Sequence, residues 1–249
     1  MSDQFKDKII CGDCITVMRD MPENSIDMIL CDLPYGTTQC SWDTIIPFEP
    51  LWESYERIIK HNGAIVLTAS QPFTAKLGMS NIEWLKYSWI WRKATATGHL
   101  NAHIMPMKNH EDILVFAAKT PAYNPQGLVK YGQLQKRGNN GSCYGESRSE
   151  NWQEYTNYPR TVLEFSGVSK RCHPTQKPVT LFEYLIKTYT NEDEVVLDNC
   201  IGSGTTAVAA IRTGRHYIGI DISPEYCEIA RERICIEQSQ LKLDLGGAE

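Results

Sequence analysis

Four consecutive residues, Asp32-Leu33-Pro34-Tyr35, carry the groups needed to activate an amine on an aromatic ring. Such an amine is a weak nucleophile because its lone pair is delocalised into the ring. A carboxylate and a main-chain carbonyl that accept its two hydrogens would aim the lone pair at an electrophile about 3–3.5 Å away. Asp32 and the carbonyl of Pro34 suit these roles, and Tyr35 offers a flat face for stacking. Taken alone, the four residues also fit a loop-capping aspartate and a core tyrosine.

A glycine-rich turn is the second group that suggests chemistry. We expect a strand over Glu194–Asp198, a turn at Gly202-Ser203-Gly204 and a helix over Thr205–Thr213. Glycine lets a ligand approach the backbone because it has no Cβ and accepts positive φ. Asp221 ends the next expected strand, Tyr217–Asp221, where its carboxylate can accept both hydroxyl hydrogens of a ribose. These features predict a site for a cofactor that contains adenosine.

Glycine spacing does not identify that cofactor. Gly202-x-Gly204-x-x-Ala207, with Asp221 nineteen residues after Gly202, also satisfies the dinucleotide fingerprint. Only about fifty residues follow Leu197, too few for a complete doubly wound sheet, so strands from the N-terminal half must complete it. The functional segments are therefore permuted relative to a dehydrogenase.

Strand and helix patterns alternate along the chain and position these groups. We expect further strands over Lys8–Cys11, Ile26–Cys31, Ala64–Thr68, Tyr87–Trp91 and Ile113–Ala117. We expect further helices over Thr16–Met21, Leu51–Lys60 (stopped by Asn62-Gly63) and Pro178–Thr188, and one that begins at Ser223-Pro224. Because open α/β sheets bind ligands at the carboxyl ends of their strands, Asp32 is expected at that edge.

Composition narrows the class of protein. The chain has 249 residues, 42% of them hydrophobic, and a formal net charge of -5, which suits one globular α/β domain and disfavours a protein that coats nucleic acid nonspecifically. No apolar run approaches the roughly 20 residues that a bilayer requires, and Met1–Lys8 is polar, so we expect a cytoplasmic protein. The nine cysteines are expected to be reduced, and Cys11 and Cys14 lack a second pair of metal ligands.

Residues 121–167 interrupt the alternation of strands and helices. This segment is rich in Gly, Asn, Ser, Tyr and Pro and has little periodicity, so we expect an insertion or a surface-binding subdomain rather than sheet core. It lies within residues 119–177, which contain nine Lys or Arg and four Glu. The chain is therefore locally basic where it looks inserted.

Together the segments closely resemble the beta class of DNA amino-methyltransferases, in which the catalytic motif precedes the cofactor motif. The resemblance covers nearly the whole chain, and His173-Pro174-Thr175-Gln176-Lys177-Pro178 is its most specific part. The other matching segments are Cys11–Cys14, Asp32–Tyr35, Gly63–Pro72, Glu111–Phe116 and Asp198–Asp221. The resemblance implies an α/β, Rossmann-like fold of the S-adenosylmethionine-dependent methyltransferases, with a mostly parallel sheet, helices on both faces and circularly permuted motifs. It implies S-adenosylmethionine as cofactor and no metal.

The resemblance also assigns roles to residues. Asp32, Pro34 and Tyr35 would be catalytic. Asp13 and Cys14 would lie against the adenine of the cofactor, and Asp221 would hold its ribose. Thr175, Gln176 and Lys177 would meet its methionine end. The remaining expected cofactor residues are Asp198, Asn199, Cys200, Gly202, Ser203, Gly204, Thr205 and Thr206. The chain departs from the family at Leu33, which replaces the usual first proline, and at Cys200-Ile201, where the family usually has a phenylalanine.

The substrate expectation follows from the same resemblance. An aspartate at the head of the catalytic motif is typical of adenine-N6 enzymes, whereas beta-class cytosine-N4 enzymes more often have serine. We expect N6 methylation of adenine in double-stranded DNA by base flipping, with cytosine N4 as the alternative. Residues 119–171 would form an inserted target-recognition region, and residues 1–118 and 172–249 the catalytic domain. The expected DNA contacts are Lys136, Arg137, Arg148, Lys170 and Arg171.

Other functions and partners stay open at this level. The resemblance raises a homodimer and a cognate endonuclease of a restriction-modification system as partners. From other classes, a noncatalytic DNA-binding module fits the basic insertion. A nicotinamide oxidoreductase fits the glycines but leaves Asp32–Tyr35 unexplained. Related motifs also occur in enzymes that methylate RNA or a protein glutamine.

Overall fold

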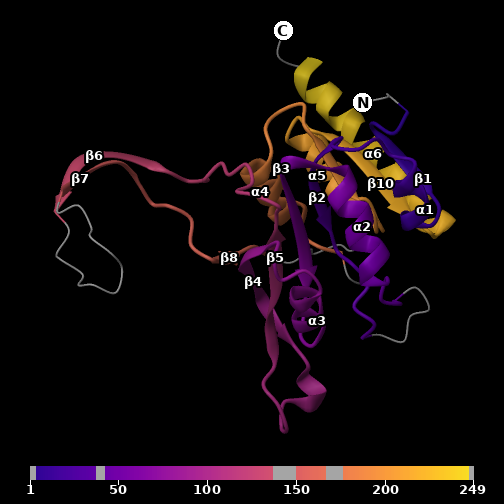
Figure 1. Ribbon diagram of the computed structural model, residues 1–249, viewed down its shortest axis with the longest axis horizontal. Helices are drawn as coiled ribbons and strands as arrows, with labels where there is room; N and C mark the ends of the chain where they lie inside the picture. The colour runs from indigo at the N-terminus through magenta and orange to yellow at the C-terminus, as the bar shows by residue number, and fades with distance from the viewer. Residues whose placement is uncertain (1–3, 38–42, 137–149, 167–175, 247–249) are drawn as a thin grey trace. The chain divides into compact units, whose positions relative to one another are not determined.

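The computed structural model describes residues 4–37, 43–136, 150–166 and 176–246 (Figure 1). Strands and helices alternate through most of this part of the chain. In chain order they are β1 (Lys8–Cys11), α1 (Cys14–Arg19), β2 (Ile26–Cys31), α2 (Phe48–Ile58), β3 (Ile59–Ala69), α3 (Phe73–Ser80), β4 (Leu85–Thr97), a short 3-10 helix (His99–Asn101), β5 (Lys108–Phe116), β6 (Val129–Lys136), β7 (Glu150–Thr156), β8 (Val162–Glu164), α4 (Val179–Tyr189), β9 (Val195–Asp198), α5 (Thr205–Arg212), β10 (His216–Asp221) and α6 (Pro224–Gly246).

One mixed sheet organises the main body of the chain. Its strand order is β1-β10-β9-β2-β3-β5-β4-β8. β5 runs antiparallel to both of its neighbours, and all other neighbouring strands are parallel. The C-terminal strands β9 and β10 lie between the N-terminal strands β1 and β2. The expectation that N-terminal strands complete the nucleotide-binding half of the sheet is therefore confirmed.

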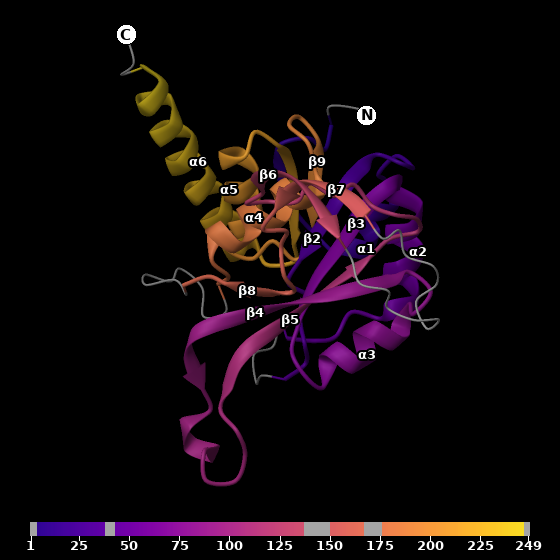
Figure 2. The ribbon, with the colours of Figure 1, turned by 90° about the vertical axis from the view of Figure 1, so that its left-hand side faces the viewer.

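Helices cover both faces of this sheet. Apolar side chains of α1, α2 and α3 pack in one core cluster, and those of α4, α5 and α6 pack in another on the opposite face. Figure 2 shows the two helical layers on either side of the strands. β2 lies between them with all six residues buried, which explains why its sequence is almost continuously apolar.

The boundary between α2 and β3 differs from expectation. The helix ends at Ile58 rather than near Asn62-Gly63, because Ile59 takes an extended conformation and pairs with Ile26 of β2. Gly63 lies inside β3, where an added Cβ would come within 2.8 Å of the carbonyl oxygen of Asp27. Gly63 therefore permits close approach of two backbones, a role that glycine also has inside strands.

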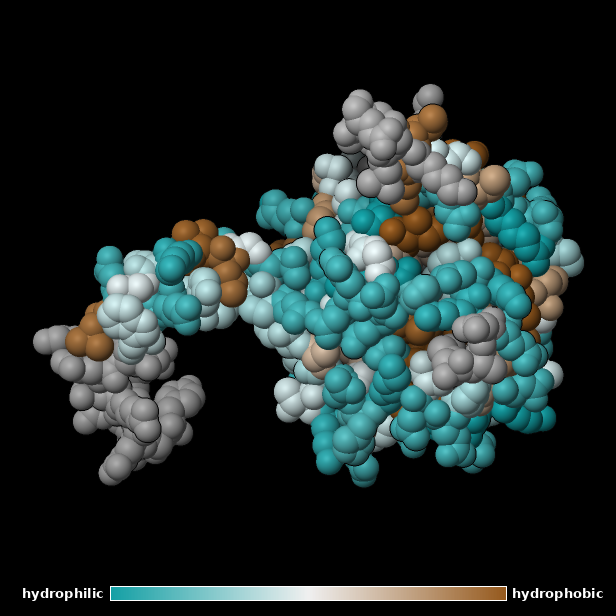
Figure 3. Space-filling model, turned by 90° about the horizontal axis from the view of Figure 1, so that it is seen from above, coloured by the Kyte–Doolittle hydropathy of each residue, from teal (hydrophilic) through white to brown (hydrophobic). Residues whose placement is uncertain are grey.

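The separate compact unit of the structure spans fewer residues than the insertion expected over residues 119–171. Residues 125–160 form a separate compact unit, in which β6 and β7 pair as an antiparallel hairpin. β8 pairs with β4 in the main sheet, so the expected insertion over residues 119–171 includes residues of the main body at both ends. Exposed apolar side chains of the hairpin unit include Val129, Leu134 and Trp152, and Figure 3 shows hydrophobic surface on this unit.

Two further properties concern the described part of the chain. No helix in it combines the length and the apolar character that crossing a membrane would require. Its six cysteines are free thiols, and Cys14, Cys31 and Cys227 are buried among them. Burial raises the pKa of Cys14 to about 12, so this thiol stays protonated at neutral pH.

Candidate active site

The carboxyl ends of adjacent strands bring the expected site residues to one edge of the sheet. Asp32 directly follows β2, Asp198 ends β9 and Asp221 ends β10. β9 pairs with both β2 and β10, so these three carboxylates belong to neighbouring strand ends. β1 ends beside Asp221, because Cys11 is its partner in the register and Gly12 N donates to its carbonyl at 2.9 Å. The topology thus gathers at one edge the groups that the sequence separates by nearly two hundred residues.

Asp32 is held from three directions. Its Oδ2 accepts a hydrogen bond from Lys177 Nζ at 2.5 Å. Its Oδ1 accepts one from the Tyr35 hydroxyl at 2.8 Å and another from the Thr68 hydroxyl of β3. The side chain remains 24% exposed, so the carboxylate is fixed in orientation and still accessible. A carboxylate oxygen accepts more than one hydrogen bond, which leaves Asp32 able to receive an amine hydrogen after a small rearrangement.

Lys177 connects Asp32 to a second partly buried carboxylate, that of Glu111. Its Nζ lies 3.3 Å from Glu111 Oε2, and Lys93 of β4 binds the other oxygen, Oε1. Burial alone would lower the pKa of Lys177, but Asp32 and Glu111 outweigh it and raise the pKa above its ordinary value. Glu111 Oε2 is buried and has no hydrogen bond within the described structure. It therefore offers the Lys177 ammonium a second acceptor when Asp32 engages another donor.

Tyr35 uses both its ring and its hydroxyl. One ring face stacks on Phe73 with centroids 5.1 Å apart and planes at 23°. Lys177 Nζ lies 5.7 Å from the centroid of the Tyr35 ring. Burial, followed by the charge of Asp32, raises the pKa of Tyr35 well above its ordinary value, so its hydroxyl remains a donor at neutral pH. Leu33, the departure from the family motif, is buried in the core and anchors the loop by packing instead of by a fixed φ.

The two glycines of the turn after β9 differ in surroundings. Gly204 has φ 83°, and a Cβ there would lie 3.1 Å from Ala230 of α6. Gly202 has φ 49°, and a Cβ there would meet only the Cys200 carbonyl oxygen, at 3.9 Å. Gly204 thus allows α5 and α6 to pack closely, whereas Gly202 leaves its outer side clear for a ligand.

Asp221 and Asp198 organise this turn. Asp221 accepts from Gly202 N through Oδ2 and from Ser223 N through Oδ1, each at 2.9 Å. Each oxygen keeps a lone pair for a ribose hydroxyl, so the donor set fits an adenosine-containing cofactor. Asp198 is buried and accepts from Cys200 N at 3.0 Å and from the Thr206 hydroxyl. Burial raises the pKa of Asp198 to about 6.

Other expected cofactor residues are placed around the same edge. Asn199 is buried and accepts a 2.5 Å hydrogen bond from Tyr55 of α2. Asp13 caps α1 and accepts from Thr16 N at 2.9 Å, while the following Cys14 is buried. Hydrogen bonds from Thr16 lower the pKa of Asp13. Their contacts with a cofactor remain predictions.

The structure shows partners of Lys177 that the resemblance did not name, because its ammonium is bound to Asp32 and faces Glu111. The contact expected between Lys177 and the methionine end of the cofactor stays a prediction. Gln176 is half-buried beside it. Five expected residues lie outside the described residues, namely Thr175, Arg137, Arg148, Lys170 and Arg171. Lys136 ends β6 in the hairpin unit.

Sequence reasoning assigned no role to several residues that complete the site. Thr68 of β3 binds Asp32, Glu111 of β5 faces Lys177, and Lys93 of β4 binds Glu111. Together with Tyr35, these residues form what is here called the catalytic cluster. Arg233 of α6 donates to the Ser203 hydroxyl at 2.9 Å and steadies the glycine turn. Thr68 and Glu111 lie in segments that carried the resemblance, which was the available signal. Lys93 and Arg233 had none, because their contacts depend on long-range packing.

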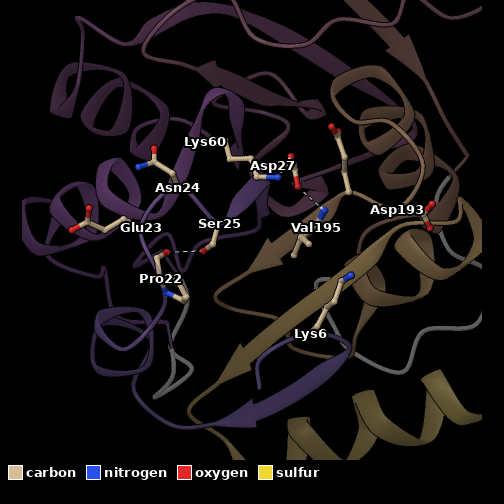
Figure 4. Close-up of a pocket in the computed structure, with 10 residues that line it drawn as sticks. Lys6, Pro22, Glu23, Asn24, Ser25, Asp27, Lys60, Asp193 and Val195 are labelled. Carbon is tan, nitrogen blue, oxygen red and sulfur yellow. Dashed lines mark hydrogen bonds and ion pairs between the residues drawn. The ribbon is translucent and has the colours of Figure 1, made fainter. Parts of the chain in front are cut away.

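A hollow at the opposite edge of the sheet has a different character (Figure 4). Asp27 lies at its centre, where it pairs with Lys60 at 2.7 Å and accepts from Val195 N at 3.0 Å. These residues stand at the amino ends of β2, β3 and β9. Ligands of open α/β sheets bind at the carboxyl ends of the strands, so the active site does not lie in this hollow. The ion pair between Asp27 and Lys60 has a structural role there. No cluster of metal-ligating side chains occurs among the residues described.

The glycine turn after β9 lies beside the carboxylates of Asp32, Asp198 and Asp221 at the carboxyl edge of this sheet. This arrangement is typical of an α/β enzyme whose cofactor contains adenosine. The family described as DNA methylase, of the N6/N4 class, matches residues 26–232. Type II methyltransferase M.HpaI of Haemophilus parainfluenzae is 32% identical over 245 residues, covering 91% of this chain and 74% of that protein. Putative methylase YubD of Escherichia coli (strain K12) is 26% identical and covers 94% of this chain and 93% of its own. The chain therefore belongs to the N6/N4 family of DNA methylases.

Solved structures share the fold. PvuII DNA methyltransferase, which is cytosine-N4-specific, matches with a TM-score of 0.65 at 15% identity, covering 93% of this chain and 91% of that one. The M1.HpyAVI–SAM complex matches with a TM-score of 0.61 at 21% identity, covering 91% and 97%. The expected fold of S-adenosylmethionine-dependent methyltransferases, with a mostly parallel sheet and helices on both faces, is confirmed.

Proposed function

We propose that this DNA methylase transfers a methyl group from S-adenosylmethionine to N6 of adenine in duplex DNA. The observation that carries the proposal is the orientation of Asp32, fixed by Lys177, Tyr35 and Thr68 at the carboxyl edge of the sheet. An aspartate at this position supports adenine over cytosine through the family resemblance. A noncatalytic DNA-binding module would have no need for a lysine buried between two carboxylates.

The residues of the chain would divide the work as follows. S-adenosylmethionine supplies an electrophilic methyl group on its sulfonium. Asp221 would hold the ribose, and Gly202 would admit the cofactor to the turn after β9. Asp32 and the Pro34 carbonyl would accept hydrogen bonds from the two N–H groups of the base amine and direct its lone pair outward. Once the methyl group is on the nitrogen, one of these N–H protons would leave by way of Asp32 to solvent.

Lys177 and Tyr35 would adjust as the amine arrives. The Lys177 ammonium turns toward Glu111 Oε2, 3.3 Å away, and frees a lone pair on Asp32. The flipped base stacks on the face of Tyr35 that Phe73 does not occupy, and this stacking offsets part of the few kcal/mol that flipping costs.

A direct assay tests this function. Purified protein is incubated with tritiated S-adenosylmethionine and plasmid DNA, and the nucleosides are separated by mass spectrometry. We expect N6-methyladenine as the product. The Asp32→Asn variant should lose about a hundredfold or more in rate and still bind cofactor. The control variant Asp7→Asn, at an exposed position, should keep full activity. N4-methylcytosine as the product would overturn the adenine assignment, and the absence of both products would overturn the activity.

Contacts with DNA outside the catalytic edge belong to the same proposal. Residues 119–171 would read the recognition sequence. Within this range, the structure describes the hairpin unit as a separate compact unit. A homodimer, a cognate restriction endonuclease and a cytoplasmic location stay predictions from the resemblance and from the sequence.

A further inference from the structure

The connection between β4 and β5 exposes large apolar side chains on an ordered projection. Every residue from Gly98 to His110 is exposed. Among them, Leu100 is 92% exposed, Ile104 68% and Met105 52%. Figures 1 and 2 both show this connection, here called the 98–107 tip, extending away from the rest of the main body. Apolar side chains gathered on such a projection mark a contact surface.

The backbone of the tip is organised by its own hydrogen bonds. Gly98 has φ 96°, which turns the chain out of β4 into the short helix His99–Asn101. Asn101 N donates to Gly98 O at 3.0 Å, and both Ile104 N and Met105 N donate to Asn101 O at 3.0 Å. The apolar side chains are thus held outward by successive turns. They are presented to a partner and are not packed on the protein.

The base of this projection is part of the catalytic cluster. Lys93 of β4 binds Glu111 of β5, and Glu111 faces Lys177, which binds Asp32. On the side of Lys93 and Glu111 that leads to the tip, β4 and β5 both extend past the carboxyl edge of the sheet. On β5, the three residue steps from Glu111 to Lys108 add about 10 Å at 3.3 Å per residue. The tip begins beyond this point, at the same edge of the sheet as Asp32.

The charge of the segment favours a polyanion. Residues 92–110 contain Arg92, Lys93, Lys108 and three histidines but no Asp or Glu, in a chain whose net charge is -5. Arg92 is paired with Glu164 and Lys93 with Glu111, so Lys108 and the histidines are the basic groups nearest the tip. No acidic side chain of this segment would face the phosphates of a duplex, so its charge is compatible with DNA as the partner.

We propose that the 98–107 tip is a wedge that enters duplex DNA next to the target base. This inference rests on the proposed function, since it names how the duplex is opened at that site. Leu100 and Ile104 enter the base stack and fill space that the flipped base vacates. Apolar wedges of this kind unstack base steps and bend the duplex. Lys108 and the histidines face the flanking phosphates.

The test combines a double variant with a matched control. Leu100→Ser with Ile104→Ser removes the wedge from a surface that carries no core contacts. Ile82→Ser removes a side chain that is 55% exposed in the turn before β4, at the other end of that strand. The recognition site is first located by sequencing plasmid DNA methylated by the unmodified protein. Rates are then compared on a perfect duplex and on one with the target base opposite an abasic position.

We expect the double variant to lose roughly tenfold or more in kcat/KM on the perfect duplex and to recover most of it on the abasic duplex, where the base is already unpaired and flips at lower cost. The Ile82→Ser control should match the unmodified protein on both. Equal rates for the double variant and the unmodified protein on the perfect duplex, or an equal loss on both duplexes, would overturn the wedge.

A second measurement does not depend on methyl transfer. In a topoisomerase relaxation assay, the unmodified protein should shift the linking number of plasmid DNA, because a side chain inserted between base steps unwinds them. The double variant should not. No shift by the unmodified protein overturns the wedge while leaving the proposed methylation intact. A shift without any methylated base supports the wedge and overturns the proposed methylation.

Discussion

Replacing Lys177 with methionine would remove one charge from the catalytic cluster at nearly constant side-chain volume. Lys177 Nζ lies 2.5 Å from Asp32 Oδ2 and 3.3 Å from Glu111 Oε2. Loss of one partner from a buried ionic network typically costs about 3–5 kcal/mol when the remaining charges persist. Here one of the two carboxylates can lower that cost by taking up a proton. We therefore expect the main effect on protonation rather than on folding.

The size of the effect follows from the geometry. Because both carboxylate oxygens lie against the same Nζ, they are at most about 6 Å apart. At an effective dielectric constant near 20, two like charges at that distance repel by roughly 2–3 kcal/mol. The variant therefore disfavours the state in which both carboxylates are charged by about that free energy. Tyr35 and Thr68 also face Asp32, and Lys93 also faces Glu111, but these groups are unchanged in the variant.

The assay is kcat at saturating DNA and cofactor from about pH 5.5 to 9. Because the repulsion disfavours the doubly charged pair, activity should be lost at a higher pH, and the acidic limb of Lys177→Met should move upward by roughly one to two pH units. Lys60→Met, which breaks the ion pair with Asp27 at the opposite edge, is the matched control and should keep the original limb. An acidic limb that stays in place, or moves downward, in a folded Lys177→Met protein would refute the reasoning.

Three further predictions concern the cofactor edge. Burial raises the pKa of Asp198 to about 6, above its ordinary value of 3.8. The folded state therefore holds this proton more tightly than the unfolded state does. The free energy of unfolding should fall as the pH rises from about 4 to 6. Asp198→Asn should remove up to about 3 kcal/mol of that fall in urea titrations at several pH values, and equal slopes would contradict the assignment. Tyr55→Phe leaves the buried oxygen of Asn199 without its donor and should lower the free energy of unfolding by about 1–3 kcal/mol in urea; an unchanged midpoint would argue against the bond. Gly202→Ala should weaken S-adenosylmethionine binding in calorimetry with a small loss of melting temperature. Gly204→Ala should mainly lower the melting temperature because its Cβ meets Ala230, and the reverse pattern would show that the roles are exchanged.

Local sequence was sufficient to predict those elements whose conformation depends mainly on interactions between neighbouring residues. The apolar run Ile26–Cys31 was predicted as a buried strand with the residue bounds that the structure gives, and Pro178 was predicted within one residue of the start of α4. The glycine turn after Asp198 and the carboxylate of Asp221 were found because tight turns restrict residue type. Weak periodicity hid β6 and β7, whose sequences place polar residues on both faces.

Sequence by itself pointed to the proposed reacting groups of this protein, because Asp32, Pro34 and Tyr35 lie within four successive residues and their chemistry is local. Tertiary structure alone decided how Asp32 is held. Since β5 runs antiparallel to its neighbours, its early residue Glu111 reaches the carboxyl edge, where Lys177 joins it to Asp32. It also placed Leu33 in the core, so that packing replaces the missing proline. Strand pairing over such separations depends on the whole buried sheet, and no short segment encodes it.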